Sequence, residues 1–269
     1  MLSFSKLSNR TFVQRLKEGY RSTYGPNPTA LDCIARAATL AMETLAHCDA
    51  AYHDAEHTQL VTLAGQEILR GKQKLEGGIS PETWLHSIIA WLFHDIGYVK
   101  GACLQDCVER DRYAAGIDDR AIELAPAATA ASLTPYHVDR SQQFVREQLS
   151  DYPSIEIEAI EANIELTRFP IPKEERYADT LGYAALTRTA DLIGQLADPR
   201  YLDKLPALYC EFEETGANVC LGCQSAADLR ATYPNFFWNV AYPYFKDGLR
   251  YLEVTQLGKQ IIANLYANV

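Results

Sequence analysis

The sequence lacks any run of apolar residues near 18 positions long, which argues against a membrane-spanning helix. Residues 1–20 are mixed and polar, so the apolar stretch of a secretory signal is missing too. Basic residues are also scarce, because 25 Lys and Arg stand against 35 Asp and Glu in 269 residues, a formal net charge of −10. A broad acidic surface repels a phosphate backbone. We therefore expect a cytoplasmic protein with neither nucleic acid nor membrane as partner, and a homo-oligomer stays open.

A disulfide framework is not indicated either. The seven cysteines are odd in number and irregularly spaced in a long chain without a signal. Cys220 and Cys223 form a CxxC pair, but a structural zinc site needs four ligands and no second pair stands nearby. We expect reduced thiols.

Alternating strand patterns are scarce, and most of the chain has helical periodicity. The sequence predicts an all-α fold, a single domain of about ten helices. The expected helices cover 30–46, 52–75, 81–96, 139–149, 154–167, 181–196, 199–214, 226–238 and 243–267. Residues 100–128 are expected to form a loop with short helices, and 218–225 a further loop.

The expected helix 81–96 stands out because it is apolar on nearly every side. Ser80 suits the N-cap and Pro81 the first helical position. Trp84, Trp91 and their neighbours leave no polar face, so the helix should be central and buried. Gly97 ends it.

Histidine occurs only six times in the chain, and three of the six lie in two short segments. His53 and His57 are four positions apart, so a helix would place both imidazoles on one face. His94 and Asp95 are adjacent at the end of the expected buried helix, where Gly97 lets the backbone turn and both side chains converge. Buried polar groups need partners, and a metal ion is an efficient one.

Asp191 is the third element, a carboxylate in an apolar stretch of the expected helix 181–196. A buried carboxylate must be paired or must coordinate a metal. Imidazoles and carboxylates together suit a divalent ion such as Mn²⁺, Fe²⁺, Co²⁺, Ni²⁺ or Zn²⁺.

The ordered set of His57, the doublet His94-Asp95, and Asp191 resembles the HD-domain metal-dependent phosphohydrolase superfamily. Its signature is a histidine, a His-Asp doublet and a distant aspartate, all on helices. The element from Tyr52 to His57 is also similar to that of the cyclic-nucleotide phosphodiesterase branch, with Asp54 replacing the usual Asn. The match spans residues 52–193, roughly half the chain. It implies an HD-domain helical bundle with a core over 30–196 and a C-terminal helical extension over 197–269.

The resemblance implies a metal-dependent phosphohydrolase that cleaves a phosphoester, monoester or diester, of a small molecule, with a nucleotide as one candidate. His57, His94, Asp95 and Asp191 would hold one divalent ion (Mn, Fe, Co, Ni, Zn or Mg), and Asp95 could bridge to a second. Such an ion activates a water for attack on phosphorus, so Asp95 would be a catalytic residue as well as a metal ligand. His53 would be the general acid that protonates the leaving oxygen.

Recognition of the substrate is less sharply defined. Lys100 and Arg188 are candidates for binding phosphate, and a surface ion pair is an equal alternative for each. Thr167 is placed like a pocket residue in related sequences. His137 is either a ligand or pocket residue, or a loop residue before a helix.

Two other functions stay open for the same scaffold. An HD-fold ligand-binding or regulatory module would keep the metal site with weak or no catalysis. A metal-dependent oxygenase would need additional histidine ligands, which the sequence lacks.

Overall fold

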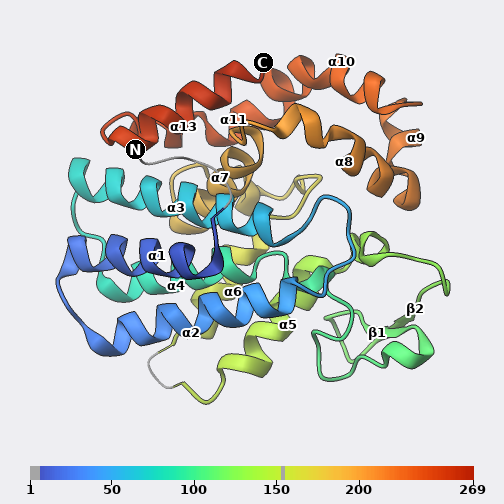
Figure 1. Ribbon diagram of the computed structural model, residues 1–269, viewed down its shortest axis with the longest axis horizontal. Helices are drawn as coiled ribbons and strands as arrows, with labels where there is room; N and C mark the ends of the chain where they lie inside the picture. Colours follow the sequence, from blue (N-terminus) through green and yellow to red (C-terminus); the bar gives the residue numbers. More distant parts are fainter. Residues whose placement is uncertain (1–6, 153–154) are drawn as a thin grey trace.

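The computed structural model describes residues 7–152 and 155–269, and its architecture confirms the all-α prediction (Figure 1). The helices are α1 (Asn9–Tyr24), α2 (Pro28–Leu45), α3 (Ala55–Leu75), α4 (Pro81–Phe93), α5 (His137–Leu149), α6 (Ile157–Glu165), α7 (Tyr183–Leu196), α8 (Tyr201–Thr215), α9 (Ala217–Leu221), α10 (Ala226–Phe236), α11 (Tyr242–Phe245), α12 (Leu249–Leu252) and α13 (Gln256–Ala267). Short 3-10 segments include η1 (Ile96–Tyr98), η2 (Val108–Arg110) and η3 (Ala130–Leu133). Among the described residues, no helix is long and apolar enough to cross a bilayer.

Helix α3 lies at the centre of the bundle. It contacts α4 and α7, and also α12 and α13 near the C-terminus. Figure 1 shows α1, α2 and α4 on one side of α3, and the helices from α8 onward across the other. The core runs through both groups, from Phe12 in α1 to Leu265 in α13.

The starts of two central helices follow directly from their sequence. Asp54 caps α3, where its side chain accepts hydrogen bonds from the backbone N–H groups of Glu56 and His57 at 2.8 and 2.9 Å. Ser80 caps α4, with Pro81 at the first turn, as expected. Residues 84–93 of α4 are all buried, which confirms its central position. The cap at Asp54 fixes the start of α3 close to His57, whereas His94 and Asp95 follow the opposite, C-terminal end of α4.

The crossing of α3 and α7 depends on a glycine. A Cβ atom on Gly194 would lie 2.6 Å from the Cα atom of Val61, so only glycine fits there without a backbone shift. Gly194 lies three positions after Asp191, and Val61 four positions after His57. The close approach therefore occurs about one helical turn from two predicted ligands.

Two segments differ from the expectation. Helix α1 was not expected within the polar N-terminal residues, yet Phe12, Leu16 and Tyr20 recur every four positions and are buried. Residues 100–128 contain 3-10 turns as predicted, but they also form a hairpin of β1 (Arg112–Ala114) and β2 (Ala121–Glu123). Strands of three residues are too short to show alternation in sequence.

The expected loop over 218–225 is wrong in its first half, because α9 (Ala217–Leu221) is helical up to its C-cap at Gly222. The other boundaries agree within a few residues, apart from the C-terminus. The expected helix 243–267 is divided into α11, α12 and α13, because Thr255 caps a new helix. The expected helix 226–238 ends at Phe236 and continues as a π-helical turn, Phe237–Ala241. The expected start of α6 at residue 154 lies outside the described residues.

Candidate metal centre

His57, His94 and Asp95 form a compact buried group that could hold a metal ion. The two Nε2 atoms lie 3.4 Å apart, and Oδ2 of Asp95 lies 3.2 and 3.3 Å from those of His57 and His94. Oδ1 of Asp191, on α7, lies 3.3 and 3.5 Å from the same two nitrogens. Thus the structure brings together all four residues predicted as ligands.

These separations fit a bound first-row divalent ion. Such ions take nitrogen and oxygen ligands at about 2.1 Å. Neighbouring ligands then lie about 3.0 Å apart around an octahedral ion and about 3.4 Å apart around a tetrahedral one. The five distances of 3.2–3.5 Å fall close to that range.

The local hydrogen bonds orient His94 for this task. Its Nδ1 atom lies 2.8 Å from the carbonyl oxygen of Trp91, a hydrogen-bond acceptor. Nδ1 therefore carries a hydrogen, and the ring presents its Nε2 lone pair to the cluster once Nε2 is deprotonated. Oδ2 of Asp95 is buried without any hydrogen-bond partner. Both features suit a cation among these atoms, since acceptors alone would repel one another.

The charges of the cluster also favour a cation. Burial works against a charged His57, but close contacts with the anionic carboxylates of Asp191 and Asp95 outweigh it and raise its pKa to about 9. The same carboxylates raise the pKa of His94 well above its usual value. In turn the imidazoles hold the pKa of Asp191 at about 2, although burial opposes this. With both rings neutral, the two carboxylates give the cluster a charge of −2, which a dication can balance in place of two protons.

The turn after Asp95 is fixed by α5. Ser141 donates to the carbonyl oxygen of His94 at 2.7 Å and accepts from the N–H of Gly97 at 2.9 Å. A Cβ on Gly97 would lie 2.0 Å from the carbonyl oxygen of His137. Gly97 is therefore needed for the close approach of α5, whereas the sequence analysis assigned it to a backbone turn.

Arg140 lies one helical turn after His137 on α5 and holds in place the segments that follow Asp95. Its guanidinium is fully buried and pairs with Asp106 through contacts of 2.9 and 3.0 Å. It also donates to the carbonyl oxygens of Gly97, Val99 and Ala114. Removing one partner of such a buried pair leaves an uncompensated charge. The sequence analysis did not identify this pair, because nothing local to Arg140 marks it as buried.

His53 lies beside the cluster, with its ring centroid 5.6 Å from that of His57. Its Nδ1 atom lies 2.6 Å from Oε2 of Glu211, on α8. Oε1 of Glu211 accepts from the backbone N–H groups of Tyr52 and His53. Burial alone would raise the pKa of Glu211. The His53 side chain and the hydrogen bonds from these N–H groups outweigh burial, so the pKa is lowered and the carboxyl is anionic. Glu211 is a site residue that the sequence analysis missed.

A stack of three rings completes this side of the site. Tyr98 lies between His53 and His137, with centroid distances of 4.6 and 4.4 Å and interplanar angles of 15° and 16°. Nδ1 of His137 lies 2.6 Å from the carbonyl oxygen of Thr134, which leaves Nε2 as an acceptor. That Nε2 lies 3.9 Å from Oδ1 of Asp95. His137 begins α5 and is a residue of the site rather than of a loop.

The three substrate-binding candidates are held by the protein itself. Lys100 pairs with Asp49 at 3.1 Å and donates to the carbonyl oxygen of Ala128 at 2.5 Å. Arg188 is buried, and it donates to two carbonyl oxygens and lies over the ring of Tyr244. Thr167 is buried and donates to the carbonyl oxygen of Ile164 at 2.8 Å. Their substrate roles stay predictions.

The cysteines stand apart from this centre. Cys220 is exposed, Cys223 is buried, and both are free thiols. Within the described ranges, no cysteine belongs to a group of three potential metal ligands.

Comparison with known families adds one finding. A profile of Npun_R2479-like proteins matches residues 2–269, so the chain belongs to the Npun_R2479-like family. Searches against curated proteins and solved structures gave no match.

Proposed function

We propose that this protein is a metal-dependent phosphohydrolase of the HD-domain type that acts on a small phosphoester. The observation that carries the proposal is the convergence of two imidazole nitrogens and two carboxylate oxygens within 3.2–3.5 Å, beside an imidazole held by Glu211.

The donor set indicates which residues would hold the ion. His57, His94, Asp95 and Asp191 combine imidazole and carboxylate ligands, which suits Mn, Fe, Co, Ni or Zn, with Mg as the hardest candidate. When bound, a divalent ion lowers the pKa of a coordinated water and draws negative charge from a phosphoryl oxygen. Nε2 of His137 lies 3.9 Å from Oδ1 of Asp95, so these two residues would be the ones to hold a second, weaker ion.

His53 and Glu211 supply the proton. In the hydrolysis a water oxygen bonds to phosphorus, the bond from phosphorus to the ester oxygen breaks, and that oxygen needs a proton. Because Nδ1 of His53 is bound to the anionic Glu211, a protonated ring keeps its second N–H, on Nε2, for the leaving oxygen. Glu211 also holds the ring plane, since its other oxygen is fixed to backbone N–H groups.

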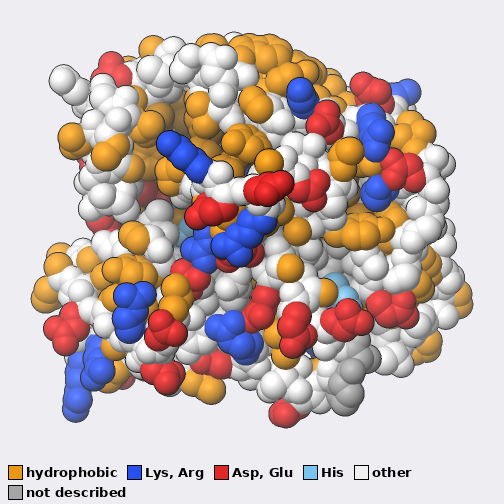
Figure 2. Space-filling model, turned by 180° about the vertical axis from the view of Figure 1, so that it is seen from behind, with side chains coloured by type: hydrophobic (Ala, Val, Ile, Leu, Met, Phe, Trp, Pro, Cys, Tyr) orange, Lys and Arg blue, Asp and Glu red, His pale blue; other side chains and the backbone are white. Residues whose placement is uncertain are grey.

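A small anionic substrate agrees with the charge of the molecule. The chain has a net charge of −10, and Figure 2 shows acidic side chains spread over one face of the molecule, which disfavours a long polyanion. A bound dication would balance the charges of Asp95 and Asp191 and would attract a phosphoryl oxygen. Lys100 and Arg188 are engaged elsewhere, so the ion itself would be the main attraction for a phosphoryl group.

Metal analysis of the purified full-length protein, followed by a metal-supplemented screen, tests the proposal. The screen covers p-nitrophenyl phosphate, bis(p-nitrophenyl) phosphate and nucleotides. We expect metal-dependent release of product, which is lost in Asp95→Asn and retained in Asp203→Asn, a change to an exposed aspartate on α8. Bound metal without turnover of any ester would contradict the proposal and favour the regulatory module.

A further inference from the structure

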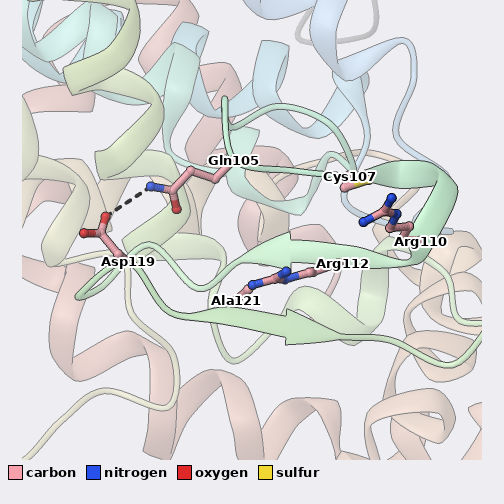
Figure 3. A pocket seen from close by; sticks show the side chains of 6 residues that line it. All are labelled: Gln105, Cys107, Arg110, Arg112, Asp119 and Ala121. Carbon is pink, nitrogen blue, oxygen red and sulfur yellow. Dashed lines mark hydrogen bonds between the residues drawn. The ribbon is translucent and has the colours of Figure 1, made fainter.

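A second concave region lies away from the metal ligands, at the β1–β2 hairpin. Here a cavity of about 360 Å³ is lined by Gln105, Cys107, Arg110, Arg112, Asp119 and Ala121 (Figure 3). Figure 3 shows Arg110 and Cys107 at one end, the Gln105–Asp119 contact at the other, and Arg112 between them. A cavity of this size can hold a small molecule.

The two arginines that line the cavity lack partners. Within residues 7–152 and 155–269, neither Arg110 nor Arg112 makes a side-chain hydrogen bond or ion pair. Most other arginines near the site are engaged, as Arg140 is with Asp106. Both guanidiniums are exposed, so they are open to an anion from solvent.

The one carboxylate that lines the cavity does not neutralise them. Oδ1 of Asp119 instead accepts a hydrogen bond from the amide of Gln105 at 3.1 Å. The cavity therefore keeps two positive charges against one negative charge, with five N–H donors on each guanidinium. Guanidinium groups match the oxygens of phosphate and carboxylate through paired hydrogen bonds.

The backbone around the cavity is held rigidly. Asp106, between two lining residues, accepts from the N–H groups of Gly101, Cys103 and Ala114 and from the buried guanidinium of Arg140. The strands pair through Tyr113 and Ile122. A site that is already ordered loses less entropy when it binds a ligand.

From the unpartnered guanidiniums, the cavity and its fixed walls, we propose that the hairpin is a binding site for a small phosphate-type oxyanion. It is separate from the metal centre and does not require the hydrolytic function proposed above. Its ligand is a free anion or the phosphate group of a larger molecule.

The test is a titration of the full-length protein with inorganic phosphate and with pyrophosphate, followed through the arginine Nε–Hε signals by NMR. We expect saturable shifts of the Arg110 and Arg112 signals. The double variant Arg110→Gln/Arg112→Gln should bind at least tenfold more weakly. Arg120→Gln changes an exposed arginine of the same hairpin that does not line the cavity, and it should stay within about twofold of the wild type.

The outcomes separate the alternatives. Absence of saturable shifts at both arginines, or an equal loss of affinity in Arg120→Gln, would overturn the proposal. The same titration of Asp95→Asn tests whether the site is separate from the metal centre. Unchanged binding of both anions supports a separate site, whereas weaker binding of either anion would overturn it.

Discussion

Oε2 of Glu211 lies 2.6 Å from Nδ1 of His53, although 158 positions separate the two residues in the chain. Helix α8 thus contributes directly to the site that the N-terminal helices build. Glu211 is buried, and its carboxylate contacts Tyr52 and His53, immediately before α3. The link makes α8 part of the catalytic machinery in the proposed function.

Glu211→Gln should weaken proton donation without removing metal. A neutral amide cannot stabilise a protonated His53 as the carboxylate does, so turnover of esters with alkyl leaving groups should fall about tenfold or more. Steady-state kinetics would measure this, with p-nitrophenyl esters as the comparison, because their leaving group needs little protonation. Glu213→Gln alters an exposed residue of α8 and should leave both rates unchanged. An equal loss for both ester types would contradict the positioning role.

His53→Ala should retain the metal and lose most activity on the same alkyl esters. A general acid typically contributes about 10²–10⁴-fold to the rate, and the loss should fall in that range. Mass spectrometry would measure the metal content. Profiles of rate against pH would test the acid role, because the fall in rate that reports deprotonation of the acid should vanish. Unchanged turnover would remove His53 from the mechanism.

Asp95→Asn should abolish tight metal binding. The amide keeps the shape of the side chain but removes the charge that faces both His57 and His94. We expect less than a tenth of the wild-type metal content after dialysis, measured by elemental analysis. Asp203→Asn serves as the matched control. Full occupancy in Asp95→Asn would show that the ligand assignment is wrong.

The metal-free protein should lose stability as the pH rises. The pKa of His57 is raised from 6.5 to about 9 by Asp191 and Asp95 against burial, so its contribution is full below pH 6.5 and disappears through pH 9. Asp191 acts at the other end, because its pKa is lowered from 3.8 to about 2, so its contribution is lost only in strong acid. Thermal unfolding of chelator-treated protein between pH 6 and 9.5 would measure the decline. Added metal should reverse it, since the ion takes the place of the protons.

Gly194→Ala should separate α3 from α7. The new Cβ would meet the backbone of Val61 at 2.6 Å, and overpacking of this kind costs about 1–3 kcal/mol. Because His57 and Asp191 lie one turn away on the two helices, metal affinity should fall together with the melting temperature. A variant that melts at a lower temperature yet binds metal as tightly as the wild type would show that the helix crossing does not position the ligands.

The sequence predicted the parts of the site that carry local patterns. The buried helix α4 and its cap at Ser80 follow from spacing and apolar context. The grouping of His57, His94, Asp95 and Asp191 was expected from the resemblance to the HD-domain superfamily. Helix α1 could also have been found, because Phe12, Leu16 and Tyr20 follow a helical period among polar residues.

Other features depend on contacts between distant segments. Glu211 and Arg140 are single charged residues whose partners are set by packing, and a burial pattern in their own helices does not reveal them. The hairpin strands are three residues long, too short for periodicity to predict. Tertiary contacts decide these features, so a single sequence leaves them open.

The close crossing at Gly194 also bears on how the protein is made. His57 and Asp191 stand 134 positions apart, and the cluster needs α7 to reach α3 before its last carboxylate is in place. During synthesis the ribosome must therefore deliver most of the chain before the cluster can close, since contacts between distant positions form late. Metal binding would then be a late step of folding, at which the metal-free chain reaches its final tertiary structure.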